Sequence, residues 1–248
     1  MSTLVEGRNA VIEALRAGAP VTAVLVAKGT EGRPIDEVRR LAQERGIPVR
    51  TVPRSALDGR SERGAHQGVI AEVAPFDYAP LETVLRTVGE RERSLVIALD
   101  HVTDEGNLGA IARVAEVAGA DALLIPKARS AGVGAAAHKT SAGAVSHLPV
   151  VREPNLVRAL ERFKDAGFWV AGASASALDL VWDAPLEGRI VLVMGSEGEG
   201  LSRLVERTCD LLVRLPVAGR VDSLNVAQAA AVLAFEWVRR GSGGADQR

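Results

Sequence analysis

The segment Leu95–Arg113 reads LVIALDHVTDEGNLGAIAR and joins a short apolar run to a helical pattern through a polar loop. The run Leu95–Leu99 is apolar at every position, as expected for a strand that is buried on both faces of a parallel sheet. Helical spacing follows over Leu108–Ala118. Because open parallel sheets bind ligands beyond the carboxyl ends of their strands, the loop from Asp100 to Asn107 is a candidate binding site.

Strand and helix patterns alternate through the rest of the C-terminal part of the chain. The predicted strands are Ala122–Ile125, Phe168–Ala171, Ile190–Met194 and Leu211–Leu215, and the predicted helices are Asn155–Ala166 and Leu224–Arg239. Alternation of this kind favours a parallel sheet that is covered by helices on both faces. We therefore predict an α/β domain over residues 94–240, followed by a disordered tail over residues 241–248.

Residues 1–75 carry a smaller α/β pattern and are predicted to form a separate domain. Its predicted helices are Asn9–Ala17 and Pro34–Gly46, and its predicted strands are Thr22–Ala27, Val49–Val52 and Val69–Val73. Residues 76–93 contain Pro80, a short helical pattern over Leu81–Val88 and a run of charged residues, and we interpret them as a linker.

The composition excludes several classes of protein. The chain has 248 residues, with 30 Lys and Arg against 31 Asp and Glu, so its formal net charge is −1. This balance excludes a strongly basic nucleic-acid coat but not local basic patches. Cys209 is the single cysteine, which excludes an intramolecular disulfide and metal sites built from two or more cysteines. The four histidines have no metal-ligand spacing, so no metal site is expected.

Nothing in the sequence indicates a membrane protein. The most apolar runs have about five residues, whereas a membrane helix needs around twenty. The opening residues MSTLVEGRNAV lack the basic region followed by an apolar region of a signal peptide. We therefore expect a cytoplasmic protein without a membrane partner.

Three polar loops follow predicted strands and are expected to meet at one edge of the predicted sheet. In the first loop, Asn107 offers hydrogen bonds in both directions and Arg113 offers a fixed fork of donors. This pair suits a phosphate-bearing substrate, although a helix cap and a solvent-facing arginine would fit the same two residues.

The second loop, Gly195–Leu201, has its glycines in the order G-x-x-G-x-G, the reverse of the dinucleotide fingerprint. This order argues against a Rossmann-like nucleotide enzyme, while the glycines still permit close approach of a ligand to the backbone. In the third loop, Pro216–Asn225, either Ser223 or Asn225 is able to cap the final helix, whose free N–H groups would then face a ligand. A tight turn and helix capping alone remain alternatives for these two loops.

A local excess of arginine lies between Arg50 and His66. The basic side chains are Arg50, Arg54, Arg60 and Arg63, and they stand against Asp58 and Glu62. This pattern fits either a patch that binds RNA phosphates or a solvated loop.

Taken together, the three loops resemble the motifs of the SpoU/TrmH branch of the SPOUT RNA methyltransferases. Asp100, Asp104, Asn107, Gly109, Ile111 and Arg113 match the first motif, Gly195, Glu197, Gly200 and Leu201 match the second, and Pro216, Gly219, Ser223, Leu224, Asn225 and Val226 match the third. Glu105, Ala227 and Gln228 depart from the family pattern. The segments Glu6–Val11 and His66–Gly68 extend the likeness over nearly the whole chain and resemble the RlmB subgroup, which methylates a ribose in 23S rRNA.

The resemblance implies an α/β fold whose C-terminal parallel-sheet domain contains a deep trefoil knot and whose small N-terminal domain is L30-like and binds RNA. It implies S-adenosylmethionine as cofactor, 23S rRNA as partner, and a homodimer to which the final helix contributes. It implies the methylation of a ribose 2′-hydroxyl, for which a guanosine of 23S rRNA is the expected target and rRNA processing the expected role.

The resemblance also implies site residues. The expected catalytic residues are Asn107, Arg113, Glu197, Ser223 and Asn225, the expected cofactor-binding residues are Gly195, Gly200, Leu215 and Leu224, and the expected RNA-binding residues are Arg8, Arg50, Arg54, Arg60, Arg63 and His66. Because an arginine keeps its proton in proteins, we expect Arg113 to hold a phosphate and to stabilise alkoxide charge rather than to act as a base.

Three alternative functions stay open at this point. Two are methyltransferases with another substrate, namely a tRNA ribose methyltransferase and a resistance-type rRNA methyltransferase. The third is a catalytically silent RNA-binding or ribosome-assembly protein on the same fold, and the presence of Asn107 and Arg113 argues against it.

Overall fold

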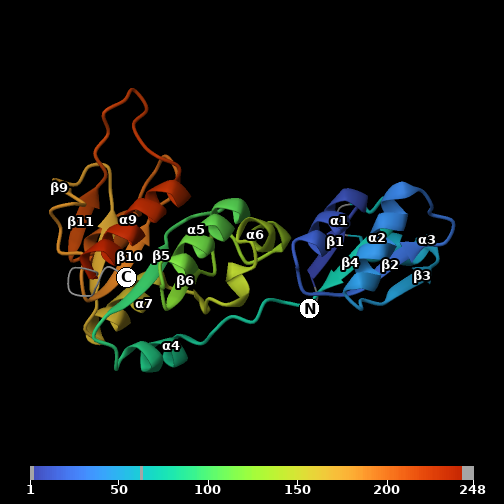
Figure 1. Cartoon of the computed structure of the whole chain (residues 1–248), viewed down its shortest axis with the longest axis horizontal. Coiled ribbons are helices and arrows are strands. Elements are labelled where there is room, and N and C mark those ends of the chain that lie inside the picture. Colours follow the sequence, from blue (N-terminus) through green and yellow to red (C-terminus); the bar gives the residue numbers. More distant parts are fainter. Residues whose placement is uncertain (1–2, 62–63, 242–248) are drawn as a thin grey trace, which may run out of the picture. The chain divides into compact units, whose positions relative to one another are not determined.

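The computed structural model describes residues 3–61 and 64–241, and the chain divides into two compact units (Figure 1). Unit 1 comprises Met1–Asp77 together with Val133–Gly143, and unit 2 comprises Tyr78–Gly132 together with Ala144–Arg248. Residues 242–248 of the predicted tail lie outside the described residues, whereas Gly241 is the last residue of a helix. No helix in the described part of the chain combines the length and the apolar character of a membrane span.

Unit 1 contains a four-stranded sheet in the order β1-β4-β2-β3. The strands are β1 (Thr3–Glu6), β2 (Val21–Ala27), β3 (Val49–Val52) and β4 (Val69–Val73), and the helices are α1 (Arg8–Arg16), α2 (Arg33–Glu44), α3 (Arg54–Asp58) and α6 (Ala135–Thr140). Strands β2 and β3 are parallel, and the other pairs are antiparallel. Strand β3 therefore forms one edge of the sheet. It follows α2 in the sequence.

The two faces of this sheet have different covers because successive side chains of a strand point to opposite sides. Val24 and Val26 pack with the apolar faces of α1 and α2 in one core cluster. Leu25 belongs to a smaller cluster, in which Leu57 of the short helix α3 is buried. One face is thus covered by two amphipathic helices and the other by a single short one.

Helix α6 is separated from the rest of unit 1 in the sequence, and its packing includes a buried histidine. The His138 ring lies edge-on to Phe76, with ring centroids 6.2 Å apart. Burial and, second, the positive charge of Arg45 lower the pKa of His138 below its ordinary value of 6.5. Unit 1 therefore packs this ring in its neutral form.

We expect the lowered pKa of His138 to make stability fall with acid. Below pH 6.5 the unfolded chain takes up a proton at this position, while the folded chain does so only at lower pH, so the free energy of unfolding decreases as pH falls through this window. His138→Gln should flatten this part of the pH dependence, as measured by urea unfolding between about pH 7.5 and 5.5. The matched control is His147→Gln, at an exposed histidine, which should keep the wild-type slope. Equal slopes in His138→Gln and the wild type would contradict the prediction.

Unit 2 contains a seven-stranded sheet in the order β7-β6-β5-β10-β8-β11-β9, and every neighbouring pair is parallel. The strands are β5 (Ser94–Leu99), β6 (Ala122–Pro126), β7 (Val150–Glu153), β8 (Trp169–Ala173), β9 (Asp179–Leu180), β10 (Arg189–Met194) and β11 (Leu211–Arg214). The helices are α4 (Leu81–Val88), α5 (Glu105–Val117), α7 (Leu156–Asp165), α8 (Arg203–Thr208) and α9 (Val226–Gly241), with a 3₁₀ turn at Ala144–Ser146. The predicted parallel α/β sheet is confirmed.

Both faces of this sheet are covered. Helices α4, α7 and α8 pack on one face, where Val96 and Phe163 belong to one buried cluster. Helices α5 and α9 contact each other, α5 also contacts β6, and α9 also contacts β10. Strands β5 and β10 are neighbours in the middle of the sheet, with Leu99 level with Met194. This register brings the first two candidate loops out of the sheet side by side.

Candidate functional site

Three side chains from the three candidate loops meet in one hydrogen-bonded cluster. Asn107 donates from Nδ2 to Oε1 of Glu197 at 3.0 Å. Asn225 donates from Nδ2 to the same oxygen at 2.6 Å and to Oδ1 of Asn107 at 3.0 Å. The carboxylate fixes the orientation of both amides, because a carboxylate oxygen only accepts hydrogen bonds. We call Asn107, Glu197 and Asn225 the amide–carboxylate cluster.

Helix capping positions the two asparagines. Asp104 caps α5 by accepting a hydrogen bond from the Asn107 backbone N–H at 2.7 Å, so this helix begins at Glu105 rather than at the predicted Leu108. The side chain of Asn225 accepts from the Ala227 N–H at 2.9 Å, and α9 accordingly begins after it. Of the two caps proposed for the final helix, Asn225 is the one observed.

The loop that carries Glu197 turns back tightly on itself. Ser196 and Gly200 exchange two backbone hydrogen bonds of 3.0 Å each. Gly198 and Gly200 have φ angles of 88° and 70°, which side-chain-bearing residues rarely adopt. A Cβ on Gly195 would overlap the backbone of Gly200. The three glycines therefore serve the shape of this loop, which presents Glu197 to both asparagines.

A cavity of about 720 Å³ opens beyond the carboxyl ends of β8, β10 and β11. It is lined by seven of the expected catalytic and cofactor-binding residues, namely Gly195, Gly200, Leu215, Leu224, Glu197, Ser223 and Asn225. Figure 1 shows the long β11–α9 loop, which supplies several of them, extending beyond the sheet. The cavity thus lies where open parallel sheets bind ligands.

Sequence reasoning missed part of this cavity. Ala173, Ser174 and Ala175 line it from the end of β8, and Gln228 lines it from α9. The strand-end rule would have pointed to Ser174, because β8 was predicted, but this loop has no distinctive motif. Gln228 was noted only as a departure from the family pattern.

Two of the five expected catalytic residues stand apart from the amide–carboxylate cluster. Arg113 is exposed on α5, and within residues 3–61 and 64–241 its guanidinium has no hydrogen bond or ion pair. Ser223 is exposed at the rim of the cavity and likewise makes no side-chain hydrogen bond to another described residue. Both side chains are therefore open to a ligand, and their catalytic roles stay predictions.

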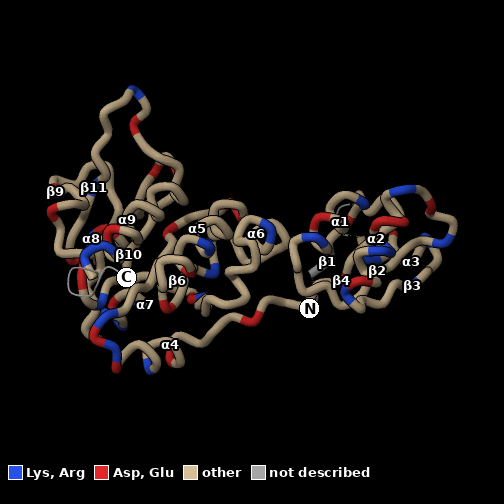
Figure 2. Tube along the Cα trace, viewed as in Figure 1, with Lys and Arg blue, Asp and Glu red and all other residues tan. Residues whose placement is uncertain are grey.

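The expected RNA-binding residues of unit 1 differ in their surroundings. Arg8 donates from Nε to the Gln67 carbonyl at 3.1 Å, and Arg60 forms an ion pair with Glu72. Arg50 and Arg54 are exposed, and neither pairs with a carboxylate in the described part of the chain. Arg63 lies outside the described residues. Figure 2 shows Lys and Arg interspersed with Asp and Glu along the trace, rather than gathered in one basic stretch.

His66 holds a loop together. Its ring is buried, its Nδ1 accepts from the Gly68 N–H at 3.0 Å, and its Nε2 lies 2.9 Å from a carboxylate oxygen of Asp58. Because Nδ1 accepts, Nε2 must carry the proton that bonds Asp58, so this geometry requires the neutral ring. RNA binding by His66 stays a prediction, and the structure gives this side chain a positioning role.

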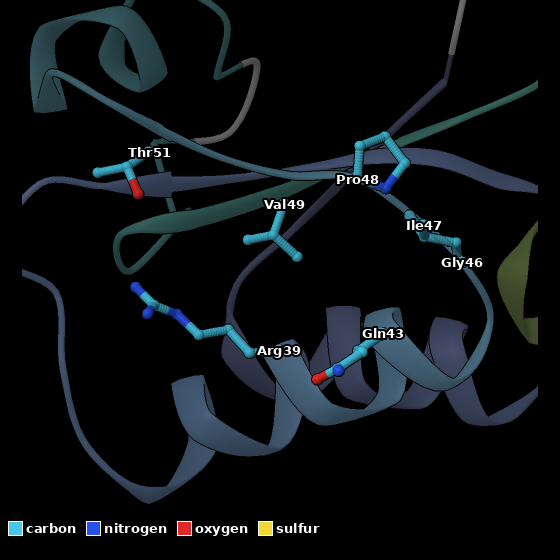
Figure 3. Close-up of a pocket in the computed structure, with 7 residues that line it drawn as sticks. All are labelled: Arg39, Gln43, Gly46, Ile47, Pro48, Val49 and Thr51. Atoms are coloured by element: carbon cyan, nitrogen blue, oxygen red, sulfur yellow. The ribbon is translucent and has the colours of Figure 1, made fainter.

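A second hollow, of about 500 Å³, lies between α2 and β3 (Figure 3). Arg39 and Gln43 line it from the helix, and Val49 and Thr51 line it from the strand. Arg39 is exposed and makes no ion pair within the described residues. The hollow is therefore lined by a guanidinium that has no ion pair with a described residue and by the exposed side chain of Thr51.

Comparison with known proteins connects this geometry to a family. Residues 94–235 match the model of the SpoU rRNA Methylase family, and residues 4–79 match a model described as RNA 2′-O ribose methyltransferase substrate binding. This chain belongs to the SpoU rRNA methylase family. It is accordingly an RNA methyltransferase, and the amide–carboxylate cluster lies within the residues that match the methylase model.

The names of individual relatives agree with this family assignment. An "Uncharacterized tRNA/rRNA methyltransferase" of Mycobacterium sp. (strain KMS) is 44% identical over 239 residues, which cover 96% of this chain and 76% of that protein. A Staphylococcus aureus (strain MSSA476) protein whose name places it in the TrmH family of tRNA/rRNA methyltransferases is 39% identical over 239 residues, 96% of each chain.

Similarity to a solved structure extends to the fold. The SpoU methyltransferase AviRb from Streptomyces viridochromogenes, crystallised in complex with the cofactor AdoMet, has a TM-score of 0.66 and 28% identity, covering 98% of this chain and 92% of that one. The predicted fold class, a knotted parallel-sheet domain of SPOUT type with a small N-terminal α/β domain, is confirmed by this similarity and by the observed sheets.

Proposed function

We propose that this SpoU family methyltransferase transfers a methyl group from S-adenosylmethionine to the 2′-hydroxyl of a guanosine ribose in 23S rRNA. The observation that carries the proposal is the amide–carboxylate cluster, of which Glu197 and Asn225 line the 720 Å³ cavity. Glu6–Val11 and His66–Gly68, which resemble the RlmB subgroup, support 23S rRNA over tRNA. Cytoplasmic rRNA processing is the role that follows.

The cavity fits S-adenosylmethionine. Gly195 and Gly200 line the cavity without side chains, so a ligand would meet only backbone at these two positions. Leu215 and Leu224 add apolar surface, and the carboxylate of Glu197 complements a cationic ligand. When bound, S-adenosylmethionine supplies a methyl group that is already activated by its attachment to a sulfonium. Gly195, Gly200, Leu215 and Leu224 would hold it.

The remaining roles are assigned to the expected catalytic residues. Arg113 would hold the target phosphate and stabilise charge that develops on the 2′-oxygen, because its guanidinium keeps its proton and has no ion pair or hydrogen bond to a described residue. Asn107 and Asn225 would orient the ribose, Glu197 would fix both amides, and Ser223 would support this arrangement. Preorganised donors of this kind lower the barrier because they need no rearrangement during the reaction.

A homodimer is the proposed assembly, with α9 at the contact. Phe235 of α9 and Val117 of α5 are 47% and 63% exposed, and these two helices lie against each other. Exposed apolar side chains on neighbouring helices support an interface between chains. Sedimentation velocity of the full chain should show a dimer, and Phe235→Asp should shift it toward the monomer.

The experiment that tests the function uses purified full-length protein, tritiated S-adenosylmethionine, and 23S rRNA and tRNA from a source that lacks the modification. We expect label in 23S rRNA at a 2′-O-methylated guanosine. Label in tRNA alone would keep the chemistry but overturn the substrate. If neither RNA is labelled but the protein binds S-adenosylmethionine, naked 23S rRNA is excluded as the substrate and an assembly intermediate takes its place. If the protein neither labels RNA nor binds S-adenosylmethionine, the result favours a silent RNA-binding protein.

RNA binding by unit 1 should depend on the unpaired arginines. We expect the double variant Arg50→Ala, Arg54→Ala to bind 23S rRNA fragments more weakly and to reduce the slope of log affinity against log salt by about 0.7–0.9 for each lost phosphate contact. Filter binding at several salt concentrations measures both quantities. The matched control is Arg40→Ala, because Arg40 is engaged by Glu44 at 2.6 Å. An unchanged slope in the double variant would exclude these two contacts.

A further inference from the structure

The cavity is lined by one cationic side chain to which no role has been assigned. Arg214 is the last residue of β11, and it is the single lysine or arginine among the described residues that line the cavity. Glu197 and Asp222 are the two acidic residues of this lining. The cavity therefore offers a ligand one positive group and two negative groups.

The guanidinium of Arg214 has no partner within the described part of the chain. The residue is half-buried, and its side chain makes no hydrogen bond or ion pair with another described residue. Charged groups that lose contact with water are normally paired. The backbone of Arg214 is held in the sheet, because its carbonyl accepts from the Val181 N–H at 3.0 Å. The sheet thus fixes the position of this residue and leaves its charge available to an anion.

A hydroxyl lies beside this guanidinium at the same end of the cavity. Ser174 follows β8 and lines the cavity, and its N–H bonds the carbonyl of Val213, the residue before Arg214, at 3.0 Å. The Oγ of Ser174 lies 2.9 Å from the Oγ of Ser176, and either hydroxyl is able to donate. Ser174 can therefore accept a hydrogen bond from Ser176 and donate its own to an anion.

The positive and the negative groups come from different parts of the sheet edge. Glu197 follows β10 and Arg214 ends β11, and β8 lies between these two strands. Since neighbouring strands are 4.7–4.9 Å apart, the ends of β10 and β11 are about 10 Å apart. A ligand with charges of both signs in separate places fits this arrangement better than a simple anion does.

S-adenosylmethionine has such a distribution of charge. Its methionine part carries a carboxylate and an ammonium group, and its sulfonium is positive. The carboxylate matches a guanidinium, which binds it through two parallel hydrogen bonds, and the two cationic groups match the acidic residues. An RNA phosphate fits less well, because the two carboxylates of the cavity repel a polyanion.

We infer that Arg214 binds the carboxylate of S-adenosylmethionine, and that Ser174 donates a further hydrogen bond to it. The glycines and leucines assigned to the cofactor offer backbone and apolar surface but no partner for this charge. The carboxylate is remote from the methyl group that is transferred, so Arg214 contributes to binding rather than to the chemical step. This inference rests on the proposed function and deepens it.

The test compares two ligands that differ only in this carboxylate, namely S-adenosylmethionine and its decarboxylated form. Isothermal titration of the full-length wild type should show about 10–100-fold tighter binding of the carboxylated ligand, the usual contribution of a charge-assisted hydrogen bond. Arg214→Met, which removes the charge but keeps an apolar side chain, should bind the two ligands with similar affinity. Its affinity for the decarboxylated form should equal that of the wild type, which would show that the cavity is intact.

Two further variants serve as controls. Arg214→Lys keeps the charge without the planar fork and should retain part of the preference for the carboxylated ligand. Arg158→Met, at an exposed arginine of α7 that does not line the cavity, should retain all of it. In methyl transfer, Arg214→Met should raise the KM for S-adenosylmethionine and leave kcat close to the wild-type value, because a contact made equally in the ground state and the transition state affects binding alone.

The outcomes separate this inference from the proposed function. Equal affinity of the wild type for both ligands, or an undiminished preference in Arg214→Met, would show that Arg214 does not bind the carboxylate. If that variant instead loses RNA affinity and salt dependence while it keeps the preference, Arg214 contacts a phosphate and the inference is wrong. A wild type that prefers S-adenosylmethionine but methylates no RNA would overturn the proposed function alone, whereas a wild type that binds neither ligand would overturn both.

Discussion

Arg113→Ala is expected to lower methyl transfer to RNA by about 10²–10³-fold, the usual cost of removing one preorganised donor from a developing oxyanion. The guanidinium is exposed and has no ion pair within the described residues, so its removal should disturb neither α5 nor the amide–carboxylate cluster. Arg113→Lys should recover little of the rate, because an ammonium group lacks the planar fork that binds a phosphate through two hydrogen bonds. Single-turnover kinetics with saturating S-adenosylmethionine measure the effect directly.

The control for Arg113 is a second exposed arginine on a helix of the same unit. The side chain of Arg158 on α7 has no ion pair or hydrogen bond to another described residue, and Arg158→Ala should keep the wild-type rate. Nearly full activity of Arg113→Lys would show that two-point phosphate binding is wrong and that only the positive charge matters. Full activity of Arg113→Ala would remove this residue from the site altogether.

Helix geometry explains why Asn107 and Arg113 were grouped in the sequence but are separated in the structure. Both lie on α5, six residues apart, which corresponds to about 120° around the helix axis. Asn107 therefore contacts Glu197 while Arg113 points to another side. The strand-end rule identified the correct edge of the sheet, but it carries no information on the rotation of the helix that follows.

The sequence predicted elements well where a local pattern alone determined them. Strands Val49–Val52 and Val69–Val73 and helix Leu81–Val88 have the bounds expected from their apolar spacing. Elements that depend on tertiary contact were missed. The two-residue strand β9 exists through its pairing with β11, and α6, with only six residues, is stabilised by its packing in unit 1.

The parts of the site that the sequence did not predict depend on contacts between residues that are far apart in the sequence. The hydrogen bond from Asn107 to Glu197 spans 90 residues, and the one from Ser202 to Asp100 spans 102. The burial of Asp100, whose carboxylate accepts from the Ser202 N–H, is likewise a property of the folded chain.

The second large effect is expected at Gly195, where Gly195→Ala should weaken binding of S-adenosylmethionine and reduce methyl transfer by about 10²-fold or more. A Cβ at this position would overlap the carbonyl group of Gly200, so the loop could no longer close through the paired backbone hydrogen bonds of Ser196 and Gly200. Isothermal titration with S-adenosylmethionine measures the loss.

Gly219→Ala is the control for Gly195→Ala. It distinguishes a change in the geometry of the Gly195 loop from the general effect of adding a methyl group to the cavity. Gly219 lines the same cavity, its φ is not in the left-handed region, and a Cβ there would meet nothing within 4 Å. We therefore expect wild-type affinity for this variant. Displacement of the Gly195 loop would also move Glu197, so Gly195→Ala should lose more in the rate than in the affinity, because the orientation of Asn107 and Asn225 depends on that carboxylate. If affinity and rate fell by the same factor, the Gly195 loop would contribute only to binding of S-adenosylmethionine. Its connection to the amide–carboxylate cluster would then not contribute to catalysis.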